Sequence, residues 1–370
     1  MRKVLFLLGT RPEAIKLAPV IKAFQRSGAF EVKVCSTSQH REMLDQVLTF
    51  FQVKVDFDLK VMEPNQTLPD LTARIIQSFS ANVLVNFKPD WLIVQGDTTT
   101  AMAGAMAGFY QKIKIGHVEA GLRSYNIFSP FPEEMNRLVV SKLAYCHFCP
   151  TKRSVQNLAR EGVVQHVFEV GNTVIDALLM GKELMQTDQD EYSSGFHKID
   201  FKKKIILVTC HRRESFGDPF LSICQALKIL ADADENNLIV YPVHLNPNIQ
   251  NQAKTYLQHP RIHLMEPLSY PHFLWLMDKS YMILTDSGGI QEEAPSLHKP
   301  VIVLRDVTER FESIEAGTAI LAGTSSERIV TESLRLLTDK AHYDRMTAIA
   351  NPYGDGKASE RIIEIIRELS

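Results

Sequence analysis

The sequence predicts an α/β fold of two Rossmann-like domains, each with a parallel sheet, and a cleft between them. Three observations lead to this expectation. Short apolar runs alternate with amphipathic stretches throughout the chain, which is the pattern of strands and helices in turn. The apolar runs are continuous rather than alternating, as in parallel strands buried on both faces. The length of 370 residues exceeds that of one ordinary domain.

The first series of elements runs to Asn172 and predicts a first domain over residues 1–172. It opens on KVLFLLG (3–9), an apolar run that ends in a glycine before a helical pattern begins. The further predicted strands are EVKVCST (31–37), WLIVQGD (91–97), KIGHVE (114–119) and HVFEVGN (166–172), with helices over 13–26, 41–51, 69–88, 101–111 and 133–144.

A polar and irregular segment at 185–204 indicates the passage to a second domain, expected over 173–354. The second series contains KIILVTCHRRES (204–215), NLIVYPVHLNP (237–247), IHLMEPL (262–268), YMILTDSGG (281–289) and PVIVLRDV (300–307). A turn cluster, NPYGDG, and a helix follow it. Because ligands of such sheets bind at the carboxyl ends of strands, we expect the functional residues there.

The composition argues against several classes of protein. With 41 basic and 43 acidic side chains, the net charge of −2 gives no reason to expect nucleic-acid or membrane-surface binding. No apolar run approaches the ~20 residues of a membrane helix, and MRKVLFLLGT lacks the small-residue cleavage site of a signal peptide. The five cysteines show no disulfide framework, which fits a reducing, cytoplasmic location.

The pair CHFC at 146–149 has the spacing of a redox or metal motif. No second cysteine pair accompanies it, and the run ends at Pro150 as a buried strand does. We therefore expect a structural strand and no metal.

Acidic side chains follow the strands of the first half. Asp97 opens a helix, Glu119 directly follows a strand, and Glu133 lies in the first turn after Pro132. Each has a structural alternative, namely helix capping, surface exposure or pairing with the helix dipole. Proton transfer needs an acid and a base, and these three residues supply candidates.

The segment TDSGGIQEE (285–293) predicts a phosphate site, although neither GxGxxG nor a P-loop is present. Backbone N–H groups at a helix start favour phosphate, and two glycines let a ligand approach closely. Glu293 is a candidate for accepting hydrogen bonds from a ribose diol. Plain capping by Ser287 is the alternative. In the second domain, His211 stands beside two arginines at a strand end, where they can neutralise a diphosphate.

Ten motifs, in order along essentially the whole chain, resemble the non-hydrolysing UDP-N-acetylglucosamine 2-epimerases of bacteria. They are GTRPEAIK, QHREMLDQV, GDTTT, GHVEAGLRS, PFPEEMNR, GNTVIDAL, HRRESFG, VYPVHLNPN, LTDSGGIQEEAPSL and NPYGDGKAS. The resemblance implies the GT-B architecture, with the C-terminal helix (355–370) packed back on the first domain. It also implies a homodimer that interconverts UDP-GlcNAc and UDP-ManNAc for surface polysaccharide, without a cofactor.

The resemblance also implies a route. UDP leaves C1 as the C2 proton is removed, giving 2-acetamidoglucal, and UDP then adds again after protonation from the other face. Carried over to this sequence, the essential positions are Asp97, Glu119, Glu133 and His211, and the ligand contacts are Arg11, Lys16 and Arg310. The phosphate and ribose cradle is Ser287, Gly288, Gly289 and Glu293, with Leu268 and Phe273 at the uracil, and the regulatory-site candidates are Gln39, Glu42, Arg212 and His244.

The chain departs from the family pattern at three positions. Gln95 stands where a histidine is common, Phe311 replaces a proline, and Glu42 replaces a frequent glutamine. The alternatives are a hydrolysing epimerase that releases ManNAc and UDP, a GT-B glycosyltransferase, and a nucleotide-sugar sensor without catalysis.

Overall fold

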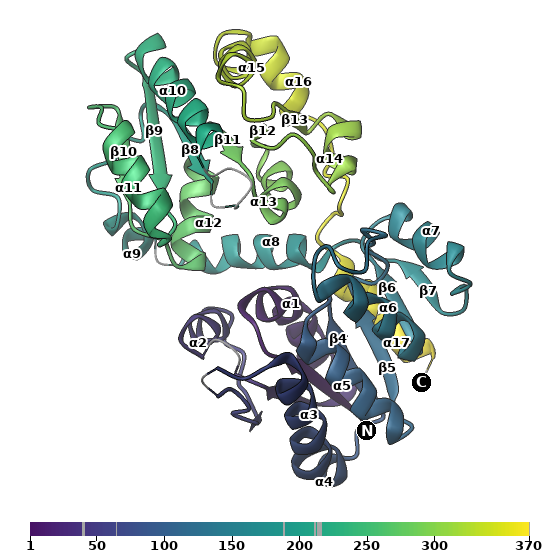
Figure 1. Ribbon diagram of the computed structural model, residues 1–370. Helices are drawn as coiled ribbons and strands as arrows, with labels where there is room; N and C mark the ends of the chain where they lie inside the picture. Colours follow the sequence, from purple (N-terminus) through teal and green to yellow (C-terminus); the bar gives the residue numbers. More distant parts are fainter. Residues whose placement is uncertain (39–40, 64, 188, 211, 213–216, 370) are drawn as a thin grey trace. The chain divides into compact units, whose positions relative to one another are not determined.

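The computed structural model describes residues 1–370 with the exception of 39–40, 64, 188, 211, 213–216 and 370 (Figure 1). The chain forms two compact units, Met1–Met180 with Tyr353–Ser370 (unit 1) and Gly181–Pro352 (unit 2). The chain therefore passes from one unit to the other inside helix α8 (Thr173–Met185), beyond the predicted boundary at Asn172.

In the described residues, unit 1 is built on a sheet of seven parallel strands in the order β3-β2-β1-β4-β5-β6-β7. Its inner strand β1 carries the continuous apolar run from Val4 to Leu8, and each of these side chains is completely buried. The predicted parallel sheet is confirmed. The strands are β1 (Arg2–Leu8), β2 (Phe30–Ser36), β3 (Phe57–Asp58), β4 (Trp91–Gln95), β5 (Lys114–Val118), β6 (Cys146–Cys149) and β7 (Val167–Glu169).

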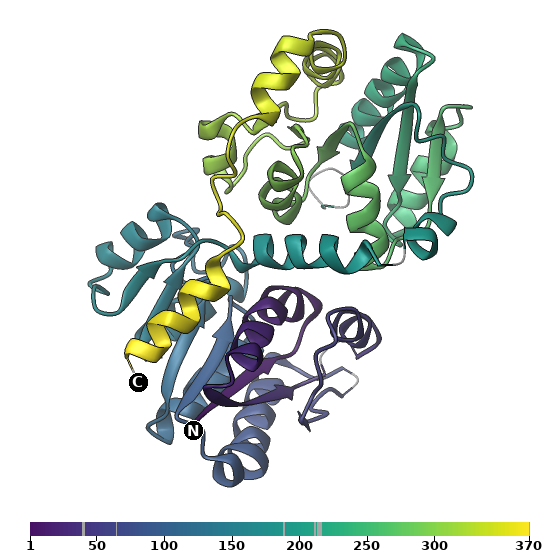
Figure 2. The same cartoon turned by 180° about the vertical axis from the view of Figure 1, so that it is seen from behind.

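Helices cover both faces of this sheet. Helices α3, α5 and α6 pack side by side on one face, and α1 and α17 pack together on the other, as Figures 1 and 2 show from opposite sides. The helix predicted over 69–88 is divided by a π-helical turn at Ser80–Leu84. The helices are α1 (Arg11–Ser27), α2 (Arg41–Phe50), α3 (Leu68–Phe79), α4 (Val85–Phe87), α5 (Thr99–Tyr110), α6 (Glu133–Leu143), α7 (Lys152–Arg160) and α17 (Ala358–Glu368).

Helix α5 packs very closely on the sheet because small residues face it. A Cβ atom on Gly104 would lie 2.1 Å from Cδ2 of Leu7, and one on Gly108 would lie 2.8 Å from Cδ2 of Leu92. A larger residue at either position would require the leucine side chain that it meets to move. This close contact fixes the start of α5, which directly follows Asp97 and Thr98.

Helix α17 completes unit 1. Its side chains Ile362, Ile363 and Ile366 are buried, and the helix packs against α1. Asp176 in α8 accepts hydrogen bonds from the backbone N–H of Ala358 and of Ser359 (3.3 and 2.7 Å), which are free donors of the first turn of α17. These two hydrogen bonds join residues that are 182 and 183 positions apart, and they attach the C-terminal segment 353–370 to unit 1.

In the described residues, unit 2 is built on six parallel strands in the order β10-β9-β8-β11-β12-β13. The strands are β8 (Lys204–Thr209), β9 (Asn237–Pro242), β10 (Ile262–Met265), β11 (Met282–Thr285), β12 (Val301–Val303) and β13 (Ala319–Leu321). The helices are α9 (Gln189–Ser194), α10 (Asp218–Ala233), α11 (Pro247–Tyr256), α12 (Tyr270–Lys279), α13 (Gly288–Glu293), α14 (Phe311–Ala316), α15 (Ser326–Thr338) and α16 (Lys340–Thr347).

The polar segment 185–204 belongs to unit 2 and does not link the units, so this expectation was wrong. Its few aromatic residues decide its position. The ring of Phe196 stacks on Trp275 of α12 at 5.0 Å between centroids, and Phe201 meets the edge of the same ring at 4.9 Å. These two aromatic contacts hold the segment on unit 2 although most of its residues are polar.

The CHFC motif is strand β6, and all four of its residues are buried. Burial raises the pKa of both Cys146 and Cys149 to about 12, so the thiols stay protonated. Within the described ranges, no group of three or more His, Cys, Asp and Glu side chains is placed to hold a metal ion. Over the same ranges, no helix combines the length and the apolar character needed to cross a membrane.

Two buried histidines lie opposite each other, His117 in β5 and His147 in β6. Burial lowers the pKa of His117 to about 4, although its bond to the Gly96 carbonyl opposes this effect. Burial, together with the positive charges of His117 and Arg123, lowers the pKa of His147 to about 3. Below about pH 6.5 these two histidines bind protons in the unfolded chain but stay neutral in the folded one. Unit 1 therefore loses stability as the pH falls below this value.

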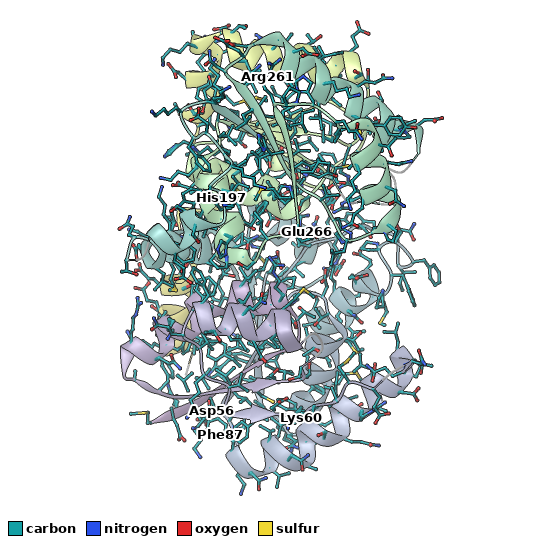
Figure 3. All side chains as sticks on the ribbon, turned by 90° about the vertical axis from the view of Figure 1, so that its left-hand side faces the viewer. Asp56, Lys60, Phe87, His197, Arg261 and Glu266 are labelled. Carbon is teal, nitrogen blue, oxygen red and sulfur yellow. The ribbon has the colours of Figure 1, made fainter. Side chains whose placement is uncertain are left out.

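We expect His147→Leu to flatten this pH dependence. The slope of the unfolding free energy against pH should be smaller in the variant. Near pH 5 the difference should be about 1.3 kcal/mol per pH unit, because the variant chain takes up one proton fewer when it unfolds. Urea unfolding followed by Trp91 fluorescence in a Trp275→Phe background measures unit 1. The control is His197→Leu at an exposed position (labelled in Figure 3), and equal slopes in both variants would contradict the expectation.

Candidate functional site

Glu119 joins three segments of unit 1 at the carboxyl ends of its strands. It follows β5, is only 8% exposed, and has a φ of +63°, which is uncommon for a residue with a side chain. Its carboxylate is paired with the ammonium of Lys16 and accepts hydrogen bonds from the side-chain amides of Gln95 and, at 3.5 Å, Asn172. Such a strained backbone persists only where the surrounding contacts determine it, as at functional sites.

Asp97 is held by helix α6. Arg137 donates from Nε to Oδ2 of Asp97 at 2.8 Å, and a second guanidinium nitrogen lies 2.6 Å from the same oxygen. Asn136 donates to the backbone carbonyl of Asp97 at 2.8 Å. The side chain of Asp97 is 26% exposed, so ligands can reach it while Arg137 fixes its direction.

The neighbouring acids Glu133 and Glu134 have different environments. Glu134 is buried and accepts hydrogen bonds from the backbone N–H of Ser124 and of Tyr125, both at 3.0 Å, and from Arg137 at 2.9 Å. Burial raises the pKa of Glu134, but these donors outweigh it and lower the pKa. In contrast, Oε2 of Glu133 is a buried oxygen that accepts no hydrogen bond from the described residues. Glu134 therefore holds a loop, whereas Glu133 has an oxygen available for chemistry.

The two predicted cations of helix α1 differ in position. Arg11 is its first residue and is partly exposed. Lys16 lies one turn further on, and its ammonium is paired with Glu119 rather than presented alone to solvent. Its expected contact with a diphosphate stays a prediction.

The predicted phosphate cradle surrounds the start of α13 in unit 2. Strand β11 ends before the buried Asp286, and Ser287 precedes the helix without making a side-chain capping bond, so the capping alternative is not observed. A Cβ atom on Gly288 would lie 3.6 Å from the guanidinium of Arg310. One on Gly289 would lie 3.6 Å from a carboxylate oxygen of Glu293. The structure thus brings together the five candidates Ser287, Gly288, Gly289, Glu293 and Arg310.

Acidic residues hold the arginines of this edge. Arg310 is paired with Glu292, and Arg305 and Arg212 contact Glu309 at 2.8 and 3.4 Å. Burial raises the pKa of Glu309, but Arg310 and Arg305 outweigh it and lower the pKa to about 2. Glu309 is therefore a fixed negative charge among cations.

The remaining unit 2 candidates lie near the ends of β9 and β10. His244 is exposed, and its Nδ1 accepts a hydrogen bond from the Asn246 backbone. Leu268 and Phe273 are half-buried, before and within α12. Glu266, labelled in Figure 3, lines a cavity of about 170 Å³ together with Val243, Gln250, Lys254, Leu264 and Met265.

Three predicted residues cannot be placed. His211 and Gln39 lie outside the described residues, as does the side chain of Glu42. A larger cavity of unit 1, about 590 Å³, has an almost wholly apolar lining from α3, α5 and α6 and does not suit a diphosphate.

Comparison with known proteins decides the family. The model of the family described as UDP-N-acetylglucosamine 2-epimerase matches residues 22–367. The UDP-N-acetylglucosamine 2-epimerases of Salmonella typhimurium and Escherichia coli (strain K12) are each 51% identical, over 99% of this chain and 98% of theirs. The chain belongs to the UDP-N-acetylglucosamine 2-epimerase family.

Solved structures of UDP-GlcNAc 2-epimerases share the fold. The one from Neisseria meningitidis, bound to UDP-GlcNAc, has a TM-score of 0.90 and 48% identity, and the match covers 99% of this chain and 100% of that one. The enzyme from Methanocaldococcus jannaschii, in complex with UDP-GlcNAc and UDP, has a TM-score of 0.80 and 32% identity, with 99% of each chain covered. The expectation of a GT-B-like, two-sheet fold is confirmed.

The sequence does not predict several residues of the candidate site. Arg137 and Asn172 lie inside motifs that carried the resemblance, yet their roles depend on partners 40 and 53 residues away, Asp97 and Glu119. The role of Glu134 depends on the backbone of a loop 9 and 10 residues before it. Gln95, which departs from the family pattern, donates a hydrogen bond to Glu119, so this position bears directly on the acid. The sequence signal that could have indicated these residues is their position at the end of a predicted strand or within one of the quoted motifs.

Proposed function

We propose that the chain interconverts UDP-GlcNAc and UDP-ManNAc by inversion at C2, without net hydrolysis. The family supports epimerisation of UDP-GlcNAc. The observation that carries the finer proposal is the cluster of acids at the carboxyl edge of unit 1. Glu119 is fixed by three donors, Asp97 is fixed by Arg137, and Glu133 has a buried oxygen without a partner among the described residues.

The chemistry requires such a cluster. The C2 proton is not next to a carbonyl, so simple deprotonation is very unfavourable. Elimination avoids this difficulty, because the C1–O bond to UDP breaks as the C2–H bond breaks, and 2-acetamidoglucal forms. Protonation of C2 from the other face, with return of UDP to C1, then gives the epimer. Both faces of C2 must meet an acid or a base.

We assign proton transfer to Asp97 and Glu119, with Glu133 as a further acid, base or positioning group. The Glu133 oxygen that lacks a partner among the described residues suits a group that accepts and returns a proton. The leaving diphosphate needs fixed positive charge, which we assign to Arg11, Lys16 and Arg310, and we assign work on the diphosphate to His211 as well. No redox cofactor or metal is needed for this route.

In unit 2, we assign the diphosphate and ribose to Ser287, Gly288, Gly289 and Glu293, and the uracil to Leu268 and Phe273. Closely placed glycines and an uncapped helix start support this assignment. We also propose that Gln39, Glu42, Arg212 and His244 bind a regulatory UDP-GlcNAc, that the enzyme is a homodimer, and that its product feeds surface polysaccharide. The reaction would require residues of both units.

Incubation of the purified protein with UDP-GlcNAc in D₂O tests the proposal. We expect UDP-ManNAc to form, with deuterium at C2 of both nucleotide sugars and no stoichiometric free UDP. Free ManNAc and UDP in equal amounts would instead identify a hydrolysing epimerase. Transfer to an added acceptor would identify a glycosyltransferase, and binding without any exchange at C2 would identify a sensor.

A further inference from the structure

Glu13 is a fully buried carboxylate outside the set of proposed catalytic residues. Its side chain is 0% exposed and accepts four hydrogen bonds. Oε2 accepts from the backbone N–H of Gly9 (3.0 Å) and from the N–H and the hydroxyl of Thr10 (2.7 and 2.8 Å). Oε1 accepts from the hydroxyl of Thr98 at 2.7 Å.

Part of this arrangement is an ordinary helix cap. Thr10 and Glu13 form a capping box at the start of α1, and Thr67 and Asp70 form the same box at the start of α3. Asp70, however, is exposed, and among the described residues its hydrogen bonds stay within its own box. Burial and the bond to Thr98 therefore distinguish Glu13 from a residue that only caps a helix.

The bond to Thr98 connects two turns that are 85 residues apart in sequence. Thr98 is the N-cap of α5 and accepts a hydrogen bond from the Ala101 N–H, so its own hydroxyl hydrogen is free for Glu13. It also directly follows Asp97. On the other side, the Gly9–Thr10 turn leads directly into Arg11. Glu13 is thus bonded to the neighbours of two proposed site residues, one from each turn.

Neutral donors alone hold this carboxylate in the described part of the chain, where no ion pair to Glu13 is found. Burial raises the pKa of Glu13, and the four hydrogen bonds oppose this effect. Two of the four partners are backbone N–H groups, which can only donate, and the two hydroxyls are placed to donate as well. A capping role alone does not require burial of the carboxylate, because the exposed Asp70 forms the same capping box.

We propose that Glu13 is a positioning residue, which couples the turn of Arg11 to the turn of Asp97 and sets the placement of Asp97 for proton transfer. The inference rests on the proposed function. It predicts that a change confined to the Thr98 bond slows the reaction without a matching loss of substrate affinity.

Glu13→Gln makes such a change. The amide oxygen can keep the three donors of the Gly9–Thr10 turn. The amide nitrogen takes the place of Oε1 and can only donate, so the Thr98 hydroxyl loses its charged acceptor. Thr98→Val removes the donor to Glu13 together with the cap of the Ala101 N–H, and Thr98→Ser keeps both. Asp70→Asn is the matched control, because it alters a capping box that has no bond to the site.

The experiment measures kcat and KM for UDP-GlcNAc, deuterium exchange at C2, and thermal unfolding of each variant beside the wild type. Since small displacements of a catalytic group cost about 10²-fold, we expect E13Q and T98V each to lose about that factor in kcat. KM should stay within about threefold, and the double variant should be no slower than either single variant. Asp70→Asn and Thr98→Ser should keep the wild-type kcat.

A folded E13Q enzyme with the kcat of Asp70→Asn would overturn the proposal, as would additive losses in the double variant. If E13Q does not fold, the comparison of T98V with T98S decides, and equal kcat values in these two would also overturn it. Failure of the wild type itself to exchange deuterium at C2 would refute the proposed function instead, so the two failures are distinguishable.

Discussion

Glu119→Gln is expected to lower kcat for epimerisation by about 10³-fold or more while UDP binding changes little. The carboxylate of Glu119 faces donors from Lys16, Gln95 and Asn172. An amide at this position would turn an NH₂ group toward one of these donors and leave a buried ammonium or amide without an acceptor. The variant therefore loses both a negative charge and the fixed direction of the group.

Single-turnover conversion of UDP-GlcNAc and calorimetric titration with UDP measure the two quantities. The control is Glu169→Gln, since Glu169 also ends a strand of the same sheet but is exposed. If the loss of activity in E119Q equalled the fraction of the variant that is unfolded, Glu119 would be a structural residue only, contrary to its proposed role. Near-normal turnover in the folded variant would exclude a role in proton transfer.

Removal of residues 355–370 is expected to unfold unit 1. The deletion exposes the surface against which Ile362, Ile363 and Ile366 pack, and it removes the backbone donors of α17 to Asp176. Three buried isoleucines contribute about 6 kcal/mol at roughly 2 kcal/mol each. A loss of this size is comparable to the total stability of about 5–15 kcal/mol that folded proteins have.

Each unit contains one tryptophan, Trp91 and Trp275, so single-tryptophan variants follow the unfolding of each unit separately. The truncated chain should show an unfolded Trp91 signal. A graded test compares Ile366→Ala, expected to cost about 2–5 kcal/mol, with Glu364→Ala on the exposed face of the same helix, expected to be near neutral. A native Trp91 signal in the truncated chain would contradict the expected role of α17.

The sequence predicts the parts of this molecule that depend on local pattern. The continuous apolar runs within β1 and β4 indicate strands buried on both faces, and polar residues after parallel strands meet at one edge of a sheet. The passage at 185–204 could not be read in this way. Its position depends on the contacts of Phe196 and Phe201 with Trp275, which a local average of polarity does not contain.

The sequence also could not predict which of the two adjacent acids, Glu133 or Glu134, has a structural role. Glu133 and Glu134 are adjacent and chemically identical, and only their partners distinguish a loop anchor from a group with an available oxygen. Likewise, the pairing of Lys16 with Glu119 spans 103 residues, and nothing in either local sequence indicates it. Long-range polar partners depend on the packed tertiary structure, so they follow from the fold rather than from the motif.

The return of α17 to unit 1 has a consequence for biosynthesis. Unit 2 is inserted into unit 1, because residues on both sides of it belong to unit 1. A ribosome therefore completes residues 181–352 before it makes the helix that covers α1. During that interval unit 2 has all of its strands, whereas unit 1 has its sheet but presents an uncovered apolar surface. Unit 2 can thus reach its folded state first, whereas unit 1, which carries the proposed acids, is completed only after α17 has been made.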